Sequence, residues 1–392
     1  MALSAGTRRT VACVLVGLGA LLIVAALMIP TYTIGKMAKT PLDLEITTVA
    51  VNQPDQESLV LDSTSLTEEG RSAEVNENVP LVSQRFLTIE DPSDADQMTI
   101  QAGNTLRRID KRGDTGVLSA YVDRVTIDRK TGEPVSTDPN GSIAMATNSK
   151  GESIAEPVHR TGLQYRFPIG TEKKTYPYFD VYAETSTDME FVEETEINGT
   201  TVYHFRQNVP PTDLSKVSNL PTNKLSLPAA KWGLEGGDEP ITMSRFYSNV
   251  RDLWVEPQTG TVVKGGEQLN IFYARSADKP EVPALKSHLV FDTDTVEAQL
   301  AIAKDNIDQL SLFGRILPIV LGVLGVIALI AGILLGVMGG GSGRPARAGG
   351  PSGSRPGGPA PAPAGSDAPT TTLPRSSGAD APTETIKMPK DL

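Results

Sequence analysis

The chain has 392 residues and a formal net charge of −11 at pH 7, and its residues 31–315 carry 28 basic against 43 acidic side chains, a net charge of −15. So acidic a segment argues against binding to nucleic acid, whose phosphates require a positive surface. It also argues against flat docking on anionic lipid headgroups. The single cysteine, Cys13, lies in an apolar run near the N-terminus, so residues 31–315 contain no disulfide.

Residues 11–30 form an apolar run that follows Arg8 and Arg9 and reaches Pro30. The run predicts a first transmembrane helix, with residues 1–10 as a cytoplasmic N-terminus. The alternative is a cleaved signal peptide. An uncleaved anchor is favoured because the apolar core of a signal peptide usually has only about 7–15 residues.

Residues 31–315 are expected to form a β-rich domain. Alternating or apolar stretches predict strands at 42–51, 59–61, 81–89 and 116–128. The stretch 132–151 is rich in Ser, Thr, Asn, Gly and Pro and predicts a loop.

Three places have the composition of tight hairpin turns. Asp128 and Glu256 each precede a Thr-Gly pair by three residues, and Asn198-Gly199 lies between two apolar stretches. Glycine adopts the positive φ that such turns need, and a short acidic side chain can accept hydrogen bonds from turn amides. We therefore expect Glu256 to bind its own turn, Gly260 to have a positive φ, and Trp254 to be buried. The alternative is that Asp128 and Glu256 form a paired acid and base.

Aromatic side chains gather between residues 162 and 205, with two tryptophans further along the chain. Such rings could line a groove for a lipid or a glycan, whereas aromatic residues in sheets more often form ordinary core. The candidate ligand-binding residues are Tyr165, Phe167, Tyr176, Tyr178, Phe179 and Trp254.

The period of the apolar residues changes to that of a helix at about 295–313. Val296, Leu300 and Ala303 fall on one face, and Asp294 with Glu297 resembles a capping box. We expect this helix to pack on the sheet and to end near Gly314, before Pro318.

Residues 316–338 contain no charged side chain. As a helix they would measure about 35 Å, enough to cross a hydrocarbon core of about 30 Å, and they predict a second transmembrane helix. Small residues spaced four apart allow close helix packing. We expect contact with the first span, and a homodimer is the alternative. The residues concerned are Ala328, Gly332 and Gly336 in the second span and Gly17, Leu21 and Ala25 in the first.

Residues 339–392 are rich in Pro, Gly, Ala and Thr and predict a disordered tail. The arginines beside the two spans favour a topology with both termini in the cytoplasm. The predicted fold class is therefore a membrane-anchored protein with a β-rich (mixed α+β) extracytoplasmic domain between two transmembrane helices.

No catalytic, cofactor-binding or metal-binding motif is evident. His159, His204 and His288 lie far apart in sequence, and neither span contains an ionisable residue that could relay protons or ions. The sequence predicts a non-enzymatic protein without a cofactor or metal.

Three segments carry a resemblance to a known family. They are Gly162-Leu-Gln-Tyr-Arg-Phe-Pro-Ile-Gly, Lys174-Thr-Tyr-Pro-Tyr-Phe-Asp and Leu253-Trp-Val-Glu-Pro-Gln-Thr-Gly. With the two spans, they resemble an actinobacterial family of envelope proteins of unknown function that is often labelled PorA-like porins. The two-span layout is also similar to that of the class B scavenger receptors, whose β-rich ectodomain holds a lipid tunnel. The resemblance implies a link to assembly of envelope lipoglycans and places the protein in the cell membrane.

Both predicted spans are apolar on all sides, which disfavours a pore made of these helices. We therefore expect an extracytoplasmic domain that binds or passes on a lipid or glycolipid, with the bilayer and the lipoglycan machinery as partners. The alternatives are a channel-forming helical homo-oligomer and an envelope lipid or glycan enzyme.

Overall fold

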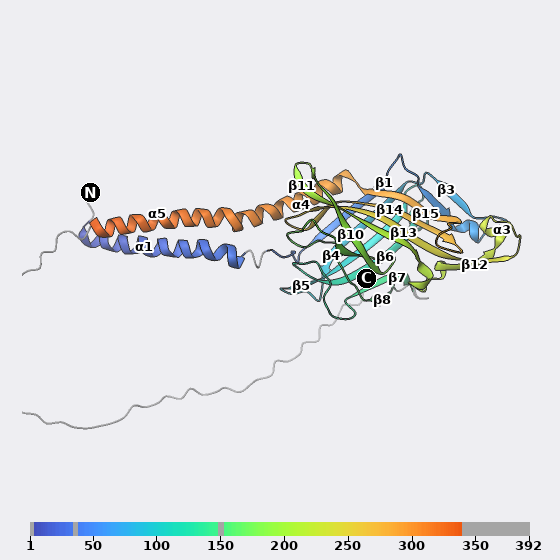
Figure 1. Cartoon of the computed structure of the whole chain (residues 1–392), viewed down its shortest axis with the longest axis horizontal. Helices are drawn as coiled ribbons and strands as arrows, with labels where there is room; N and C mark the ends of the chain where they lie inside the picture. Colours follow the sequence, from blue (N-terminus) through green and yellow to red (C-terminus); the bar gives the residue numbers. More distant parts are fainter. Residues whose placement is uncertain (1–3, 34–37, 148–152, 339–392) are drawn as a thin grey trace, which may run out of the picture. The chain divides into compact units, whose positions relative to one another are not determined.

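The computed structural model describes residues 4–33, 38–147 and 153–338. The tail predicted at 339–392 lies outside the described residues. Within the described residues, strands of one large antiparallel sheet occupy most of the chain between two long apolar helices (Figure 1). The β-rich class is confirmed, and the two helices are compatible with membrane anchoring.

The sheet runs in the order β8-β7-β6-β5-β4-β1-β15-β14-β13-β11-β10-β9, with β12 beside β13, β2 beside β15, and β3 beside β2. Most neighbours are also consecutive in sequence, as in a meander, but β1 lies between β4 and β15 and so joins the two halves of the domain. The strands are β1 (Glu45–Asn52), β2 (Leu59–Asp62), β3 (Glu74–Glu77), β4 (Leu81–Glu90), β5 (Gln97–Arg108), β6 (Val117–Asp128), β7 (Gly141–Thr147), β8 (Ser153–Val158), β9 (Tyr176–Asp180), β10 (Thr185–Ile197), β11 (Thr200–Asp213), β12 (Lys224–Pro228), β13 (Pro240–Glu256), β14 (Thr261–Ala274) and β15 (Val282–Phe291).

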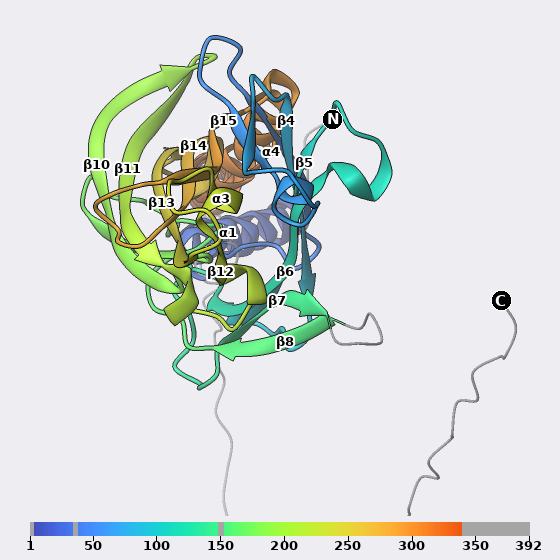
Figure 2. The same ribbon diagram turned by 90° about the vertical axis from the view of Figure 1, so that its right-hand side faces the viewer.

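The sheet curls until its two ends touch (Figure 2). Ile143 of β7 and Val158 of β8, at one end, share a buried apolar cluster with Phe179 of β9, at the other end, and with Val181. Long strands twist and coil, so a sheet of this width curls rather than staying flat. The concave face thereby forms the interior of the domain.

The strand predictions at 42–51, 59–61, 81–89 and 116–128 are confirmed by β1, β2, β4 and β6. The loop prediction at 132–151 is wrong in part, because β7 occupies Gly141–Thr147. Its glycine is required there: a Cβ at Gly141 would lie 2.6 Å from the carbonyl oxygen of Arg124 on β6. Ile143 turns inward, so the strand is held by the apolar cluster that joins the two ends of the sheet.

The predicted helix near 295–313 is α4 (Thr293–Ser311). Its N-cap is Asp292, whose carboxylate accepts a hydrogen bond from the backbone N–H of Thr295 at 2.8 Å, so the capping box predicted at Asp294 and Glu297 is wrong. Leu300 and Ala303 pack on Val263 of β14, which confirms that the apolar stripe covers the sheet.

The helix does not end at Gly314 as predicted. A single π turn, Leu312–Ile316 (η6), connects α4 to α5 (Leu317–Met338), so helical structure continues from Thr293 to Met338. Pro318 lacks a backbone N–H and its ring crowds the carbonyl four residues earlier, and a wider turn accommodates both effects.

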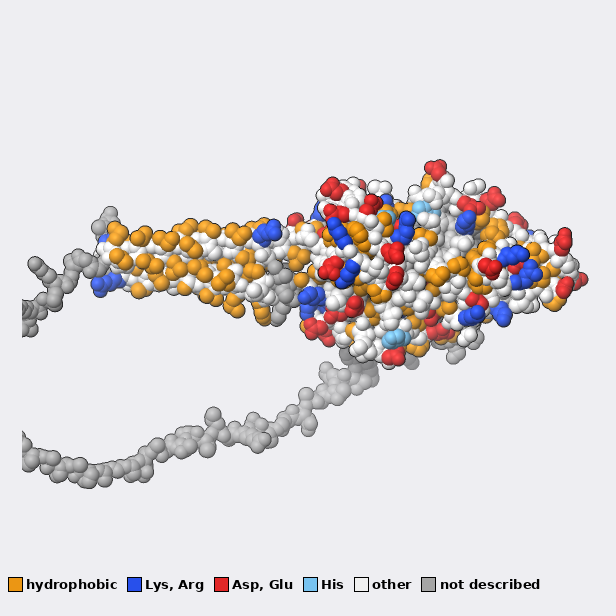
Figure 3. Space-filling model, in the orientation of Figure 1, with side chains coloured by type: hydrophobic (Ala, Val, Ile, Leu, Met, Phe, Trp, Pro, Cys, Tyr) orange, Lys and Arg blue, Asp and Glu red, His pale blue; other side chains and the backbone are white. Residues whose placement is uncertain are grey.

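The helices α5 and α1 (Ala5–Met28), the latter extended by a π turn at Ile29–Thr33 (η1), lie side by side. Most of their apolar surface is exposed, which is unusual for a protein surrounded by water on all sides (Figure 3). Their closest approach is at Gly19 and Gly325, where a Cβ on Gly19 would lie 2.7 Å from the carbonyl oxygen of Gly325.

The predicted contact between the two spans is thus present, but at partly different residues. Gly332 is buried against Val16 and the carbonyl oxygen of Ala12, and Gly336 lies at the margin of the contact. Ala328 is half-buried. Gly17 of the first span has no neighbour near its Cβ position, so the predicted stripe on that helix is wrong.

The helix pair yields a direct prediction. A Cβ built on Gly336 lies 3.8 Å from the Cβ of Ala12, and a Cβ on Gly322 lies 3.8 Å from that of Ala26, which matches the usual spacing in a disulfide. In a Cys13→Ala background, Ala12→Cys with Gly336→Cys should therefore oxidise to an intramolecular disulfide, visible as a faster-migrating monomer on non-reducing gels. Gly17→Cys with Gly336→Cys is the matched control and should not. Cross-linked dimers in place of the fast monomer would favour the homodimer instead.

Candidate functional site

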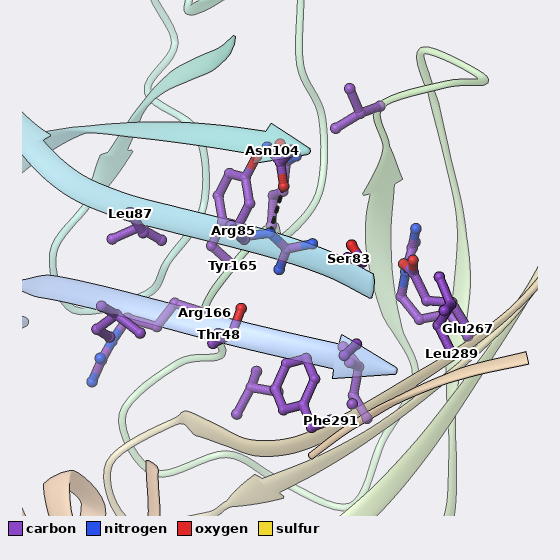
Figure 4. A pocket seen from close by; sticks show the side chains of 18 of the residues that line it. Thr48, Ser83, Arg85, Leu87, Asn104, Tyr165, Arg166, Glu267, Leu289 and Phe291 are labelled. Carbon is purple, nitrogen blue, oxygen red and sulfur yellow. Dashed lines mark hydrogen bonds and ion pairs between the residues drawn. The ribbon is translucent and has the colours of Figure 1, made fainter. Parts of the chain in front are cut away.

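The curled sheet encloses a cavity lined by side chains of β1, β4, β5, β6, β9, β13, β14 and β15. The volume of the cavity that is open to the centres of water molecules is about 150 Å³. Since one water needs about 10–15 Å³ by this measure, the cavity has room for about ten waters or for a ligand segment of similar size. Charged side chains share the lining with apolar ones, as Figure 4 shows for Arg85, Glu267, Leu87 and Phe291.

The polar and apolar residues of the lining are segregated by the register of the strands. Thr48, Arg85, Asn104 and Tyr121 are paired in sequence across β1, β4, β5 and β6 and form one polar row. On one side of it the next row is apolar on β1, β4 and β5, with Ile46, Leu87 and Ala102, and reaches Asp123 on β6. The row beyond contains Ile89, Ile100 and Val125, and Ile46, Leu87 and Ile100 are the members of these rows that line the cavity.

Arg85 is the cation of this polar row. Its Nε donates to Oδ1 of Asn104 at 2.8 Å, and its guanidinium lies 5.3 Å from the ring centroid of Tyr165. Burial lowers the pKa of Arg85, but Tyr165, Tyr121 and Glu267 raise it by more, so the guanidinium stays charged. Its side chain extends from β4 into the cavity, between Leu87 and Ser83 along the strand (Figure 4).

A second charged group in the interior is organised by Arg251 of β13. Its guanidinium donates to Glu267 at 2.6 Å and to Asp180 at 2.9 Å, and Asp180 also accepts from the hydroxyl of Tyr247 at 2.8 Å. Burial raises the pKa of Glu267, but the charges of Arg251 and Arg85 lower it by more, so the carboxylate stays ionised. Buried charges are stable only when paired in this way.

A third group surrounds Asp123 of β6. This carboxylate is fully buried and accepts hydrogen bonds from Arg160, Gln164 and Tyr165. Tyr165 has a φ of +65°, a conformation that costs a bulky residue about 1–3 kcal/mol. The bond from its hydroxyl to Asp123 holds the ring against the cavity, and burial raises the pKa of that hydroxyl well above its usual value.

The structure separates the six aromatic residues predicted to bind a ligand. Tyr165, Tyr178 and Phe179 line the cavity. Phe167 and Tyr176 are packed behind the lining, with ring centroids 5.5 Å apart, in the cluster that also contains Phe205. A role of these residues in ligand binding stays a prediction.

Trp254 lies away from this cavity, and the prediction that it is buried is wrong. It is half-buried and stacks on His204 with ring centroids 4.5 Å apart. Together with Val296 of α4, it packs against the apolar cluster that contains Val263 and Leu300. Successive side chains of a strand point to opposite faces, and the cavity-lining residues Arg251 and Leu253 of β13 have odd numbers. Trp254 therefore points to the outer face. A tryptophan in a strand does not by itself reveal which face of the sheet is covered.

The turn predictions are confirmed. Glu256 accepts from the backbone N–H groups of Gln258 at 2.9 Å and Thr259 at 2.8 Å, and Gly260 has a φ of +71°. Asp128 binds the N–H groups of Lys130 and Thr131 in the same way. Each carboxylate is thus engaged in its own turn, which argues against the paired acid and base.

The turn of Glu256 also supports the cavity. Its backbone pairs with the segment after Tyr165: Phe167 N donates to the Gly260 oxygen at 3.1 Å, and Thr171 N donates to the Pro257 oxygen at 2.7 Å. Arg166, whose pKa burial lowers to about 10, donates to the Thr259 oxygen. Two of the sequence segments that carry the family resemblance therefore hold each other in place.

Sequence reasoning did not identify Arg85, Arg251 or Glu267. One signal for Arg85 is present, because residues 81, 83, 85, 87 and 89 alternate on one face of the predicted strand and a single Arg interrupts that otherwise small or apolar face. Among the described residues, no group of three His, Cys, Asp or Glu side chains could hold a metal ion.

Comparison with known proteins places the chain in a family. The family model described as "Porin PorA" matches residues 11–334. A protein named Porin PorA from Corynebacterium amycolatum is 31% identical over 382 residues, which cover 83% of this chain and 98% of that protein. Another of that name, from Corynebacterium resistens, is 32% identical over 403 residues, which cover 84% and 96%. The chain therefore belongs to the PorA porin family.

Proposed function

We propose that this protein is a non-enzymatic, membrane-anchored envelope protein whose curled sheet binds a lipid or glycolipid in its interior and supports envelope lipoglycan assembly. The observation that carries the proposal is the cavity, where apolar side chains and a polar row lie side by side in one lining. Ligand sites of proteins combine mostly apolar walls with a few placed polar groups. In this proposal the helices anchor the domain outside the cytoplasm, with both termini inside.

The helix pair favours an anchor over a channel. Residues 317–338 of α5 contain no polar side chain, and α1 has no charge after Arg9. A conducting lumen built from such helices would have no polar lining. Helices that meet through Gly19, Gly325 and Gly332 also leave no space between them.

The sheet itself does not have the outer surface of a membrane-spanning barrel. Glu190, Glu193, Glu194 and Glu196 of β10 are all exposed. Acidic groups on a lipid-facing strand are unfavourable, and such barrels present an apolar band. The second candidate, a porin-like channel, is favoured by the name of the Corynebacterium relatives, Porin PorA.

The proposal is tested by purifying the full chain in a neutral maltoside detergent and identifying bound lipid by mass spectrometry. Thr48 faces the cavity (Figure 4). Its neighbour Thr47 is exposed and, by the pleat of β1, points to the other side of the sheet. Thr48→Trp should fill the cavity and remove most of the bound lipid, whereas Thr47→Trp should retain it. Equal lipid content in both variants and the unmodified protein would contradict the proposal. Reproducible single-channel currents from pure protein in planar bilayers, unaffected by Thr48→Trp, would establish the channel instead.

A further inference from the structure

We propose that the cavity takes an anionic amphiphile with a single acyl chain, whose terminal carboxylate or phosphate binds Arg85. The inference rests on the proposed function and specifies the ligand class of the same site. It follows from the unused hydrogen-bonding capacity of Arg85 and from the arrangement of apolar residues beside it.

Arg85 has donors that the protein does not use. Its Nε is bonded to Asn104, but among the residues that the structure describes, no hydrogen-bond acceptor is recorded for its two terminal nitrogens and no carboxylate forms an ion pair with it. A guanidinium presents its donors as a planar fork that matches a carboxylate or phosphate with two parallel bonds. The terminal nitrogens of Arg85 are at the cavity, where a ligand can reach them (Figure 4).

The other buried cations of the interior are already engaged. Arg160 binds Asp123, and Arg251 binds both Asp180 and Glu267. Glu267 attracts Arg85 across the cavity, but its carboxylate is held by Arg251 at 2.6 Å. Arg166, which also lines the cavity, donates through a terminal nitrogen to the Thr259 oxygen. Among the lining arginines that the structure describes, Arg85 is therefore the one with neither terminal nitrogen bonded within the protein.

The apolar side chains beside Arg85 indicate that the oxyanion is attached to an apolar chain. Ile46 and Leu87 line the cavity in the row next to Thr48 and Arg85, and Ile100 lines it in the row beyond. Met98 and Phe291 extend the apolar lining. A ligand with its charge at Arg85 would place its following atoms over these side chains, and a flexible acyl chain can fill the apolar part of a cavity of this volume. Free inorganic phosphate would leave this surface unused.

The test measures binding of tritiated palmitate and of its uncharged methyl ester to the full chain in neutral maltoside micelles, with Thr48→Trp defining the background outside the cavity. The unmodified protein should prefer palmitate. Arg85→Met should weaken palmitate binding roughly 10- to 100-fold, as expected for the loss of charge-assisted hydrogen bonds, and should leave the ester unchanged. Arg85→Lys should keep most of the preference. Arg112→Met, at an exposed loop arginine, is the matched control and should behave like the unmodified protein.

Competition separates the two headgroups. If hexadecyl phosphate displaces palmitate and inorganic phosphate does not, the site also accepts a phosphate that carries an acyl or alkyl chain. If hexadecyl phosphate does not displace palmitate, the site accepts the carboxylate alone. Undiminished palmitate binding by folded Arg85→Met would overturn the inference. Equal binding of palmitate and its ester by the unmodified protein would also overturn it while leaving lipid binding intact. If neither palmitate nor its methyl ester binds to the unmodified protein above background, the proposed function itself is overturned.

Discussion

Replacing Arg251 by alanine is expected to lower the free energy of unfolding by about 3–5 kcal/mol, the cost of removing one partner from a buried ion pair. Glu267 and Asp180 would both lose their cation, at 2.6 Å and 2.9 Å respectively. The side chain of Asp180 is fully buried, so solvent cannot replace the interaction that it loses. Urea unfolding of the full chain in detergent micelles, followed by tryptophan fluorescence, measures the change.

The matched control is Arg275→Ala, which breaks an ion pair with Glu281 in which Arg275 is exposed. Solvent screens such a pair, so this variant should unfold almost as the unmodified protein does. A similar loss in both variants would show that the interior charges have no special role in stability.

The destabilisation of Arg251→Ala should depend on pH. In the unmodified protein, Arg251 and Arg85 hold the pKa of Glu267 below its usual value despite burial, so its contribution is present above the unfolded pKa near 4.5 and is lost as pH falls through the lower folded pKa. In the variant, burial without Arg251 acts to raise that pKa, and protonation then favours the folded state. The difference between the two proteins should therefore be largest at pH 7 and should shrink toward pH 5. A difference that is constant with pH would contradict this assignment.

Gly260→Ala is expected to cost about 2–5 kcal/mol, more than the value of about 1 kcal/mol that backbone conformation alone suggests. Gly260 has a φ of +71°, which costs an L-residue about 1–2 kcal/mol. An added Cβ would also overlap the carbonyl oxygen of Phe167 and lie 2.7 Å from that of Pro168, and overpacking typically costs a further 1–3 kcal/mol or so. Because the same turn holds the segment that carries Tyr165, lipid binding should weaken together with stability.

Gly199→Ala isolates the backbone contribution, since Gly199 has a φ of +74° and no atom near its Cβ position. It should lose only about 1–2 kcal/mol and retain bound lipid. Equal unfolding curves for the two alanine variants would show that the segment after Tyr165 can move away from the turn at little cost.

Local signals predicted the local structure well. The turns at Asp128, Asn198 and Glu256 are encoded by a few adjacent residues, because an acidic or amide side chain and a glycine suffice to bend the chain. The strands at 81–89 and 116–128 followed from alternation in the same way. β7 was missed because its short alternation lies among Gly, Ser and Asn residues, and only the distant cluster with Phe179 shows that it is held in the sheet.

The cavity could not be predicted, because its lining comes from residues between Leu44 and Gln299 that the curl of the sheet brings together. Whether Trp254 or Tyr178 faces inward depends on the register of β13 and β9, which no short segment specifies. The helix contact at Gly19 and Gly325 was missed for a related reason, since small residues recur along both spans and only the crossing geometry selects among them.

Lipid binding in the interior of the sheet is tested most directly by photo-crosslinking with a palmitate analogue that carries a diazirine near the end of its acyl chain, applied to membranes containing the full chain. We expect labelled peptides from the apolar rows of β1, β4 and β5, around Ile46, Leu87 and Ile100, and loss of this label in Thr48→Trp but not in Thr47→Trp. Label confined to α1 and α5, with none in these strands, would contradict a lipid-binding interior.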